Sequence, residues 1–285
     1  MVGALATGTD GCNSGYFLRH SMIDHQERYC SAMSTVSAWP PVSDPGLAAE
    51  ISAALSGESL AVLLYGSRAR GAARSDSDVD VLQLVSENPR TYSQGRVNVA
   101  AYTPDHLTLL SQRGSLFVRH LRDEGLIISD PMGNLASILG QYRPPANYGP
   151  LKREMTLILS MPWVADAHQY EKSMLRAICY ASRTALYING DECNRLTFDV
   201  NKAATDSGFP SLAPLIRGAH LEQAKEISRY GFLLLKSSRP LDLPADLPSL
   251  AIWAQDEYPI AARLLEAVVA GDAEIGYTTL TLPVG

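Results

Sequence analysis

The sequence predicts an α+β protein in which a mixed β-sheet with flanking helices is followed by an α-helical bundle. Short apolar runs between residues 61 and 128 are typical of strands, and helical segments precede and follow them. A stretch dense in Pro and Gly at 140–150 separates this part from a region in which apolar residues recur at helical spacing. We therefore expect a poorly ordered N-terminal extension at 1–44, a sheet domain at 45–145 and a helical domain at 150–285.

The expected sheet domain begins with a helix at 46–55, which Ser56-Gly57 ends before the first strand. That strand, at 61–65, is apolar and stops at Gly66, and a second helix starts at Ser67. Further strands are expected at 78–82, 96–102 and 125–128, and a helical region with a break at Gly114 is expected at 105–124.

The helical domain is expected to contain helices at 151–160, 165–188, 194–206 and 221–236, and two segments around Pro259 that end at Gly271. Asn189-Gly190 are expected to end the second of these helices. Residues 277–282 alternate like a strand, but without an evident partner strand they are equally compatible with an extended tail.

Gly66 and the residues after it have the chemistry of a phosphate-binding turn. Gly66 lets a ligand approach the backbone, and the first N–H groups of the next helix have no partners within that helix. Asp78 and Asp80 alternate with valines in the next strand, so both carboxylates face the same side of it. Two carboxylates that close favour a cation, and Mg²⁺ takes hard oxygen ligands together with substrate phosphates.

The pattern Gly66-Ser67 followed by Ser77-Asp78-Val79-Asp80 resembles the signature of the DNA polymerase beta-like nucleotidyltransferase superfamily, particularly its minimal nucleotidyltransferases and aminoglycoside-type adenylyltransferases. The segment from Gly114 to Gly125 looks like the end of that family's catalytic domain. The resemblance implies a nucleotidyltransferase-type sheet. It also implies transfer of a nucleoside monophosphate, most often AMP from ATP, to a hydroxyl group with loss of pyrophosphate, and Mg²⁺ or Mn²⁺ as cofactor.

The resemblance also assigns roles to individual residues. Asp78 and Asp80 are the implied catalytic metal ligands, and Gly66, Ser67 and Arg70 are implied to bind the nucleotide. The family places a third carboxylate on a later strand, where this sequence has Asn98 in the strand at 96–102. Asn98 can offer a carbonyl oxygen to the metal but neither a charge nor a base. Asp105 is a substitute for it, although we favour Asp105 as the cap of a helix.

The helical domain resembles the substrate-binding bundle of aminoglycoside-type nucleotidyltransferases, which implies a small-molecule acceptor such as an aminoglycoside-like antibiotic. Two alternatives stay open: a toxin-antitoxin or defence nucleotidyltransferase that modifies a protein or tRNA, and a nucleotide-binding regulator that has lost turnover, which Asn98 favours. A general base can come from Glu154, Asp166 or Glu171 in the bundle, each of which is also explained as a solvated helix charge.

Composition narrows the class of protein further. With 285 residues, 46% of them hydrophobic, and a formal net charge of −6, the chain is typical of a globular protein. The acidic charge argues against sequence-independent binding to DNA. The cysteines lack Cys-x-x-Cys spacing, which favours a reducing cytoplasm, and no segment resembles a membrane span.

Overall fold

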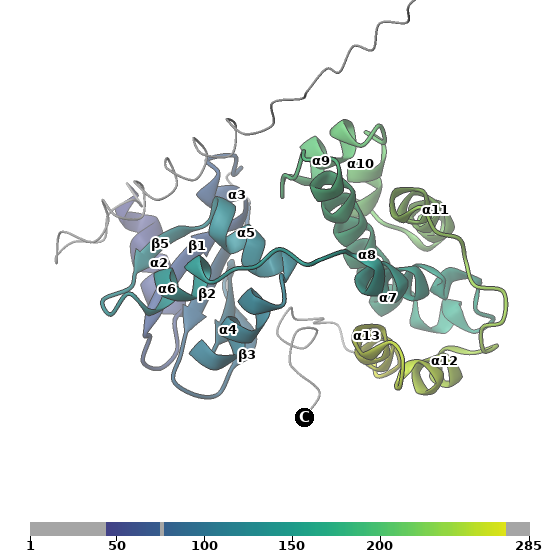
Figure 1. Ribbon diagram of the computed structural model, residues 1–285, viewed down its shortest axis with the longest axis horizontal. Coiled ribbons are helices and arrows are strands. Elements are labelled where there is room, and N and C mark those ends of the chain that lie inside the picture. Colours follow the sequence, from purple (N-terminus) through teal and green to yellow (C-terminus); the bar gives the residue numbers. More distant parts are fainter. Residues whose placement is uncertain (1–43, 75–76, 272–285) are drawn as a thin grey trace, which may run out of the picture. The chain divides into compact units, whose positions relative to one another are not determined.

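The computed structural model describes residues 44–74 and 77–271, and within them it shows one mixed five-stranded sheet (Figure 1). The strands are β1 (Ala61–Tyr65), β2 (Val79–Leu84), β3 (Arg90–Gln94), β4 (Val97–Tyr102) and β5 (Leu126–Ser129), in the order β3-β4-β2-β1-β5. Only β2 and β4 pair in parallel. The predicted α+β class and mixed sheet are confirmed, whereas the expected N-terminal extension and the segment at 277–282 lie outside the described residues.

Strand β3 was not predicted from the sequence. Its residues are mostly polar and exposed or half-exposed, so they lack the apolar alternation that marks the other strands. It is defined by its antiparallel pairing with β4, from Arg90 opposite Ala101 to Gln94 opposite Val97, and the tight turn between the two strands contains Gly95 at φ +61°. Pairing with a buried neighbour, and not local sequence, therefore makes this edge strand.

Helices cover both faces of the sheet. Helix α2 (Pro45–Ala54) packs through Leu47 and Ile51 on one face of the sheet. This face is formed by Val62, Leu64 and the valines of β2 and β4. Helices α4 (Pro104–Gln112), α5 (Leu116–Glu124) and α6 (Asn134–Gly140) cover the opposite face, which includes Leu63, Tyr65, Leu82 and Tyr102. Asp80 and Asn98 share the strand alternation of this second face, so they lie at its end rather than on the α2 side.

The predicted break at Gly114 separates α4 from α5. Gly114 adopts φ +71°, and a Cβ atom there would lie 2.6 Å from Pro145. Ser115 then caps α5 by accepting a hydrogen bond from the Phe117 N–H at 3.3 Å. The glycine is required both by its backbone conformation and by the close approach of the chain that leads to the helical region.

The helical region has its own hydrophobic cluster, which begins at Tyr148, while the sheet-side clusters end at Tyr142. Its helices are α7 (Gly149–Leu159), α8 (Glu171–Glu192), α9 (Val200–Asp206), α10 (Leu212–Arg217), α11 (Ala224–Leu235), α12 (Leu247–Ala254) and α13 (Pro259–Val269). No helix among the described residues is both long and apolar enough to cross a membrane.

Two expectations for these helices were wrong. Helix α8 does not end at Asn189-Gly190 but continues to Glu192, and Gly190 instead lies close to Leu196, whose Cα would be 3.3 Å from an added Cβ. Helix α9 starts at Val200 instead of residue 194, because Asp199 caps it by accepting from the Lys202 N–H at 3.0 Å. Helices α6 and α10 are short and were not predicted.

Candidate active site

The turn after β1 fits directly against a carboxylate of β2. Gly66 ends the strand at φ +75° and begins α3 (Gly66–Ala69), which is a single helical turn. Tyr65 pairs with Asp80 across the two strands, and a Cβ atom on Gly66 would lie 2.4 Å from Oδ2 of Asp80. The Asp80 carboxylate therefore occupies the space that a side chain at position 66 would need.

A row of polar side chains continues from Asp80 across the sheet. Asp80 pairs with Asn98 in the parallel register, and Asn98 pairs with Ser93 of β3. Nδ2 of Asn98 lies 3.4 Å from Oδ1 of Asp80, and the Ser93 hydroxyl donates to Oδ1 of Asn98 at 2.9 Å. The register expected for Asn98 is thus found, but its amide nitrogen faces Asp80. To ligate a metal, its oxygen would have to turn away from Ser93.

Asp80 is half-buried, and its environment disfavours the charged form. Burial raises the pKa of the Asp80 carboxyl, and the nearby charge of Asp78 raises it further. The hydrogen bond from Asn98 and the electrostatic influence of His120 and Arg70 lower this pKa, but they do not outweigh burial. A cation at this place would remove the conflict between the two carboxylates.

Asp78 lies just before β2 and is exposed, and Arg68 holds the backbone beneath it. Nη2 of Arg68 donates to the Ser77 carbonyl at 2.8 Å, and its Nε donates to the Asp78 carbonyl at 3.3 Å. Arg68 thereby ties the turn at Gly66 to the start of β2. This contact depends on where α3 points, which no local pattern of residues indicates.

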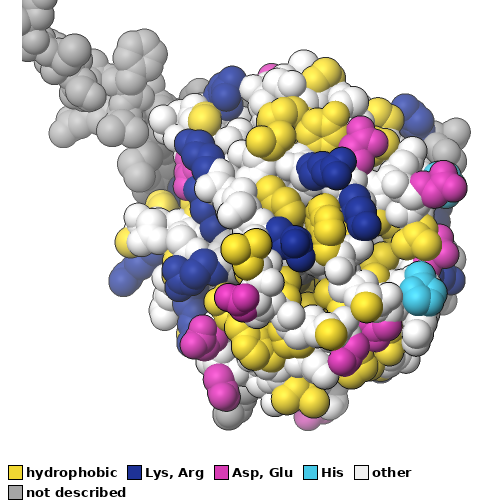
Figure 2. All heavy atoms as spheres, turned by 90° about the vertical axis from the view of Figure 1, so that its right-hand side faces the viewer, with side chains coloured by type: hydrophobic (Ala, Val, Ile, Leu, Met, Phe, Trp, Pro, Cys, Tyr) yellow, Lys and Arg dark blue, Asp and Glu magenta, His cyan; other side chains and the backbone are white. Residues whose placement is uncertain are grey.

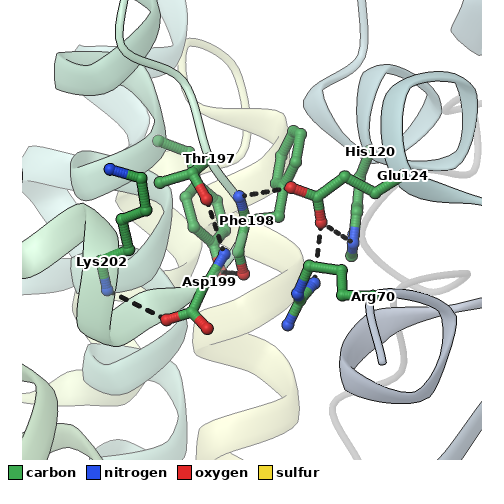
Figure 3. Close-up of polar contacts among 8 residues, drawn as sticks. Arg70, His120, Glu124, Thr197, Phe198, Asp199 and Lys202 are labelled. Carbon is green, nitrogen blue, oxygen red and sulfur yellow. Dashed lines mark hydrogen bonds and ion pairs between the residues drawn. The ribbon is translucent and has the colours of Figure 1, made fainter. Parts of the chain in front are cut away.

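Arg70, expected to bind the nucleotide, lies at the end of α3 and forms an ion pair with Glu124 at 2.8 Å (Figure 3). Glu124 also accepts from the Phe198 N–H at 3.1 Å and lies 3.4 Å from Nε2 of His120. Burial alone would raise the pKa of Glu124, but these hydrogen bonds from His120, Phe198 and Arg70 lower it to about 2. Sequence analysis missed Glu124, His120 and Phe198 altogether.

The bundle acids considered as general bases have other partners. Glu154 is buried, and its carboxylate accepts from the Ala261 N–H at 2.8 Å at the start of α13. Asp166 accepts from the Leu247 N–H at 2.9 Å at the start of α12. Glu171 is exposed in the first turn of α8. The expectation of a cleft-facing acid was therefore wrong for Glu154, which stabilises the bundle.

Asp105 is exposed in the first turn of α4, so the expectation that it caps this helix was wrong. The capping residue itself is Thr103, whose hydroxyl accepts from the His106 N–H at 3.4 Å.

The donor chemistry of the site suits a magnesium ion bound jointly with phosphates. Among residues 44–74 and 77–271, no three His, Cys, Asp or Glu side chains come together in a metal-binding arrangement. Mg²⁺ needs only one or two carboxylates when waters and substrate phosphates complete its shell. Asp78 and Asp80 meet that requirement, and they are the residues that would hold it.

Comparison with known proteins identifies a domain around this site. A model of the nucleotidyltransferase domain matches residues 48–119, which contain Gly66, Ser67, Asp78, Asp80 and Asn98. This part of the chain is a nucleotidyltransferase domain. No curated protein sequence matches the chain.

Among solved structures, this nucleotidyltransferase is similar to a nucleotidyltransferase-like protein from Exiguobacterium sibiricum 255-15. The two are 16% identical, and the match covers 67% of this chain and 72% of that chain with a TM-score of 0.26. The family match ends at residue 119, before the helical region begins.

Proposed function

We propose that this nucleotidyltransferase transfers AMP from ATP to a hydroxyl group of a small molecule and releases pyrophosphate. The observation that carries the proposal is the contact of the Gly66 turn with Asp80, because it brings a phosphate-binding backbone and a carboxylate pair to one place. In the transfer, the acceptor oxygen forms a bond to the α-phosphorus while the bond from that phosphorus to the β-phosphate breaks.

Each residue of the turn has a distinct part in this proposal. Gly66 keeps the space beside Asp80 open, and the Ser67 hydroxyl and N–H donate to phosphate oxygens. Asp78 and Asp80 would hold Mg²⁺, which supplies neutralisation of phosphate charge when bound. Asn98 donates to Asp80 and orients it, and Arg68 fixes the backbone that carries Asp78. Within this proposal Asn98 positions Asp80 and does not ligate the metal.

The charge of the chain supports a small acceptor more than a tRNA. On the face drawn in Figure 2, Lys and Arg side chains gather along one side, while elsewhere they lie among apolar and acidic side chains. Binding to a nucleic-acid backbone requires a concentrated positive surface that neutralises many phosphates. The net charge of −6 points in the same direction.

One cavity in the bundle lies away from the place proposed for this acceptor. It has a volume of about 520 Å³ and is lined by Trp163, His168 and Met174 among others. Met174 and Tyr187 are separated by about 20 Å along α8 at 1.5 Å per residue. Because Tyr187 contacts Phe198, which bonds to Glu124, the opposite end of α8 is the one next to the nucleotide turn. We propose that the acceptor binds there.

The experiment is incubation of the purified protein with ATP labelled at the α-phosphate, Mg²⁺ and a fractionated cell extract. Label in small molecules supports the proposal, whereas label in protein or RNA would assign the acceptor to the other class. The variants Asp78→Asn and Asp80→Asn should abolish labelling, and Asp105→Asn, an equal loss of charge on an exposed first turn, should retain it.

A second candidate function is favoured by Asn98, which leaves the site without a third carboxylate. A regulator would bind the triphosphate at the same turn without turnover. Calorimetric binding of Mg²⁺ and ATP together with no label in any fraction would support this function and contradict the transferase proposal.

A further inference from the structure

We infer that Glu124 is a positioning residue that couples the triphosphate-binding turn to the helical bundle, through Arg70 on one side and Phe198 on the other. The inference rests on the proposed function, because it needs a triphosphate at the turn, and it adds a route by which that ligand affects the bundle.

Glu124 is the last residue of α5, and its two carboxylate oxygens serve different parts of the molecule (Figure 3). Oε2 accepts from Nη1 of Arg70 at 2.8 Å and lies 3.4 Å from Nε2 of His120. Oε1 accepts from the backbone N–H of Phe198 at 3.1 Å. Because both oxygens belong to one planar group whose side chain is only 17% exposed, a displacement on one side changes the bond on the other.

On the nucleotide side, Arg70 is near enough to sense a triphosphate. It follows Gly66 by four residues, and its N–H bonds to the Gly66 carbonyl at 3.3 Å. Its guanidinium influences Asp80 electrostatically, so it lies within range of the metal carboxylate. Nε of Arg70 is buried and has no hydrogen-bond partner among the described residues, so a shift of the guanidinium would bring this donor to a phosphate oxygen.

On the bundle side, Phe198 is held firmly. Its ring stacks on His120 with centroids 4.3 Å apart, and its carbonyl accepts from the Tyr187 hydroxyl at 3.2 Å. The next residue, Asp199, caps α9 (Figure 3). The segment therefore cannot follow Glu124 without moving the start of α9 and the adjoining turn of α8.

Together these contacts form a continuous chain from Gly66 to α9, built from the Arg70–Glu124 ion pair, the stacking of His120 on Phe198, and hydrogen bonds to backbone groups. A phosphate that accepts a hydrogen bond from Arg70 restricts the position of its guanidinium. Through the ion pair with Arg70 the Glu124 carboxylate is then restricted too, and through its hydrogen bond so is the Phe198 N–H. The bundle that would present the acceptor is then held in one position relative to the nucleotide.

Amide hydrogen exchange of the full chain tests this without relying on activity. In the wild-type protein, Mg²⁺ and a non-hydrolysable ATP analogue should slow exchange both in the turn at 66–70 and at the Phe198 amide, the latter by about tenfold. In Glu124→Gln, which keeps the side-chain shape but loses the charge, the turn should still be protected while the Phe198 response disappears. Asp123→Asn removes a neighbouring carboxylate that pairs with Arg119 on the same helix, and it should behave like the wild type.

The outcomes separate this inference from the proposed function. If the analogue protects neither segment, triphosphate binding at the turn is refuted. Hydrogen exchange measured without ligand then still tests the bond between Glu124 and Phe198. The Phe198 amide should exchange faster in Glu124→Gln but not in Asp123→Asn. If the turn is protected in all proteins but the Phe198 amide never responds, coupling through Glu124 is wrong while the proposed function stands.

Transfer kinetics give a second test. Phe198→Ala should lower kcat about tenfold and change the dissociation constant of the ATP analogue less than twofold, because it breaks the chain beyond the nucleotide. Phe209→Ala removes a bundle aromatic that packs on Tyr230 instead, and it should spare kcat. A merely structural role for Phe198 would make the two variants equivalent.

Discussion

Replacing Gly66 by Ala is the most direct test of the site, because the cost of one methyl group can be worked out from the structure. The residue adopts φ +75°, where any L-residue other than glycine costs about 1–2 kcal/mol. The new Cβ would also lie 2.4 Å from Oδ2 of Asp80, whereas ordinary contact begins near 3.4 Å. The carboxylate or the turn must therefore shift by roughly 1 Å, and such overpacking costs about 1–3 kcal/mol more.

Gly71 supplies the matched control. It adopts φ +69°, and an added Cβ would meet no heavy atom within 4 Å. Gly71→Ala should therefore show only the backbone cost of about 1–2 kcal/mol. Gly66→Ala should lose about 2–5 kcal/mol of unfolding free energy, the sum of both contributions. Because a displacement of that size at reacting groups costs on the order of 100-fold in rate, transfer should fall that far in Gly66→Ala alone.

Urea unfolding at neutral pH and initial transfer rates with ATP would measure both effects. Equal stability and equal rates for the two glycine variants would refute the argument, since they would mean that Asp80 does not depend on the space at Gly66. A loss of stability without a loss of rate would show that the clash is real but that Asp80 is not at the reacting centre.

Three further predictions concern the charges around the site. Asp80→Asn should abolish Mg²⁺-dependent transfer yet keep or raise the unfolding free energy, because burial already disfavours the charge of Asp80. Thermal unfolding and a Mg²⁺ titration of the transfer rate test this prediction, and a near-native rate would contradict it. Without metal, Asn98→Asp should lower the melting temperature, since it puts a third carboxylate beside Asp80. Adding Mg²⁺ should restore the melting temperature. A melting temperature that does not respond to Mg²⁺ would count against the metal site. Glu124 has its pKa lowered from 4.5 to about 2, so its contribution, on the order of 3 kcal/mol, should be complete above pH 4.5 and disappear as the pH falls toward 2. Unfolding of Glu124→Gln should lack this part of the acid dependence, while Asp123→Asn should retain it.

The local pattern of the sequence was enough to predict the elements around Gly66 and Asp80. The apolar run before Gly66, the alternation around Asp80 and the position of Asn98 in the next buried strand depend on burial and period, which residues show by themselves. For the same reason the break at Gly114 and the mixed sheet followed by helices were predicted correctly.

The tertiary structure decided what these residues touch. Sequence suggested that Gly66 makes room for a ligand, but the fold shows that it makes room for Asp80. From the sequence, Glu154 was a candidate base. In the structure its carboxylate accepts from the N–H of Ala261 at the start of α13, a residue 107 positions further along the chain. Contacts such as Glu124 with Phe198 join segments that share no local pattern, because a hydrogen bond across 74 positions is set by how elements pack and not by their propensity.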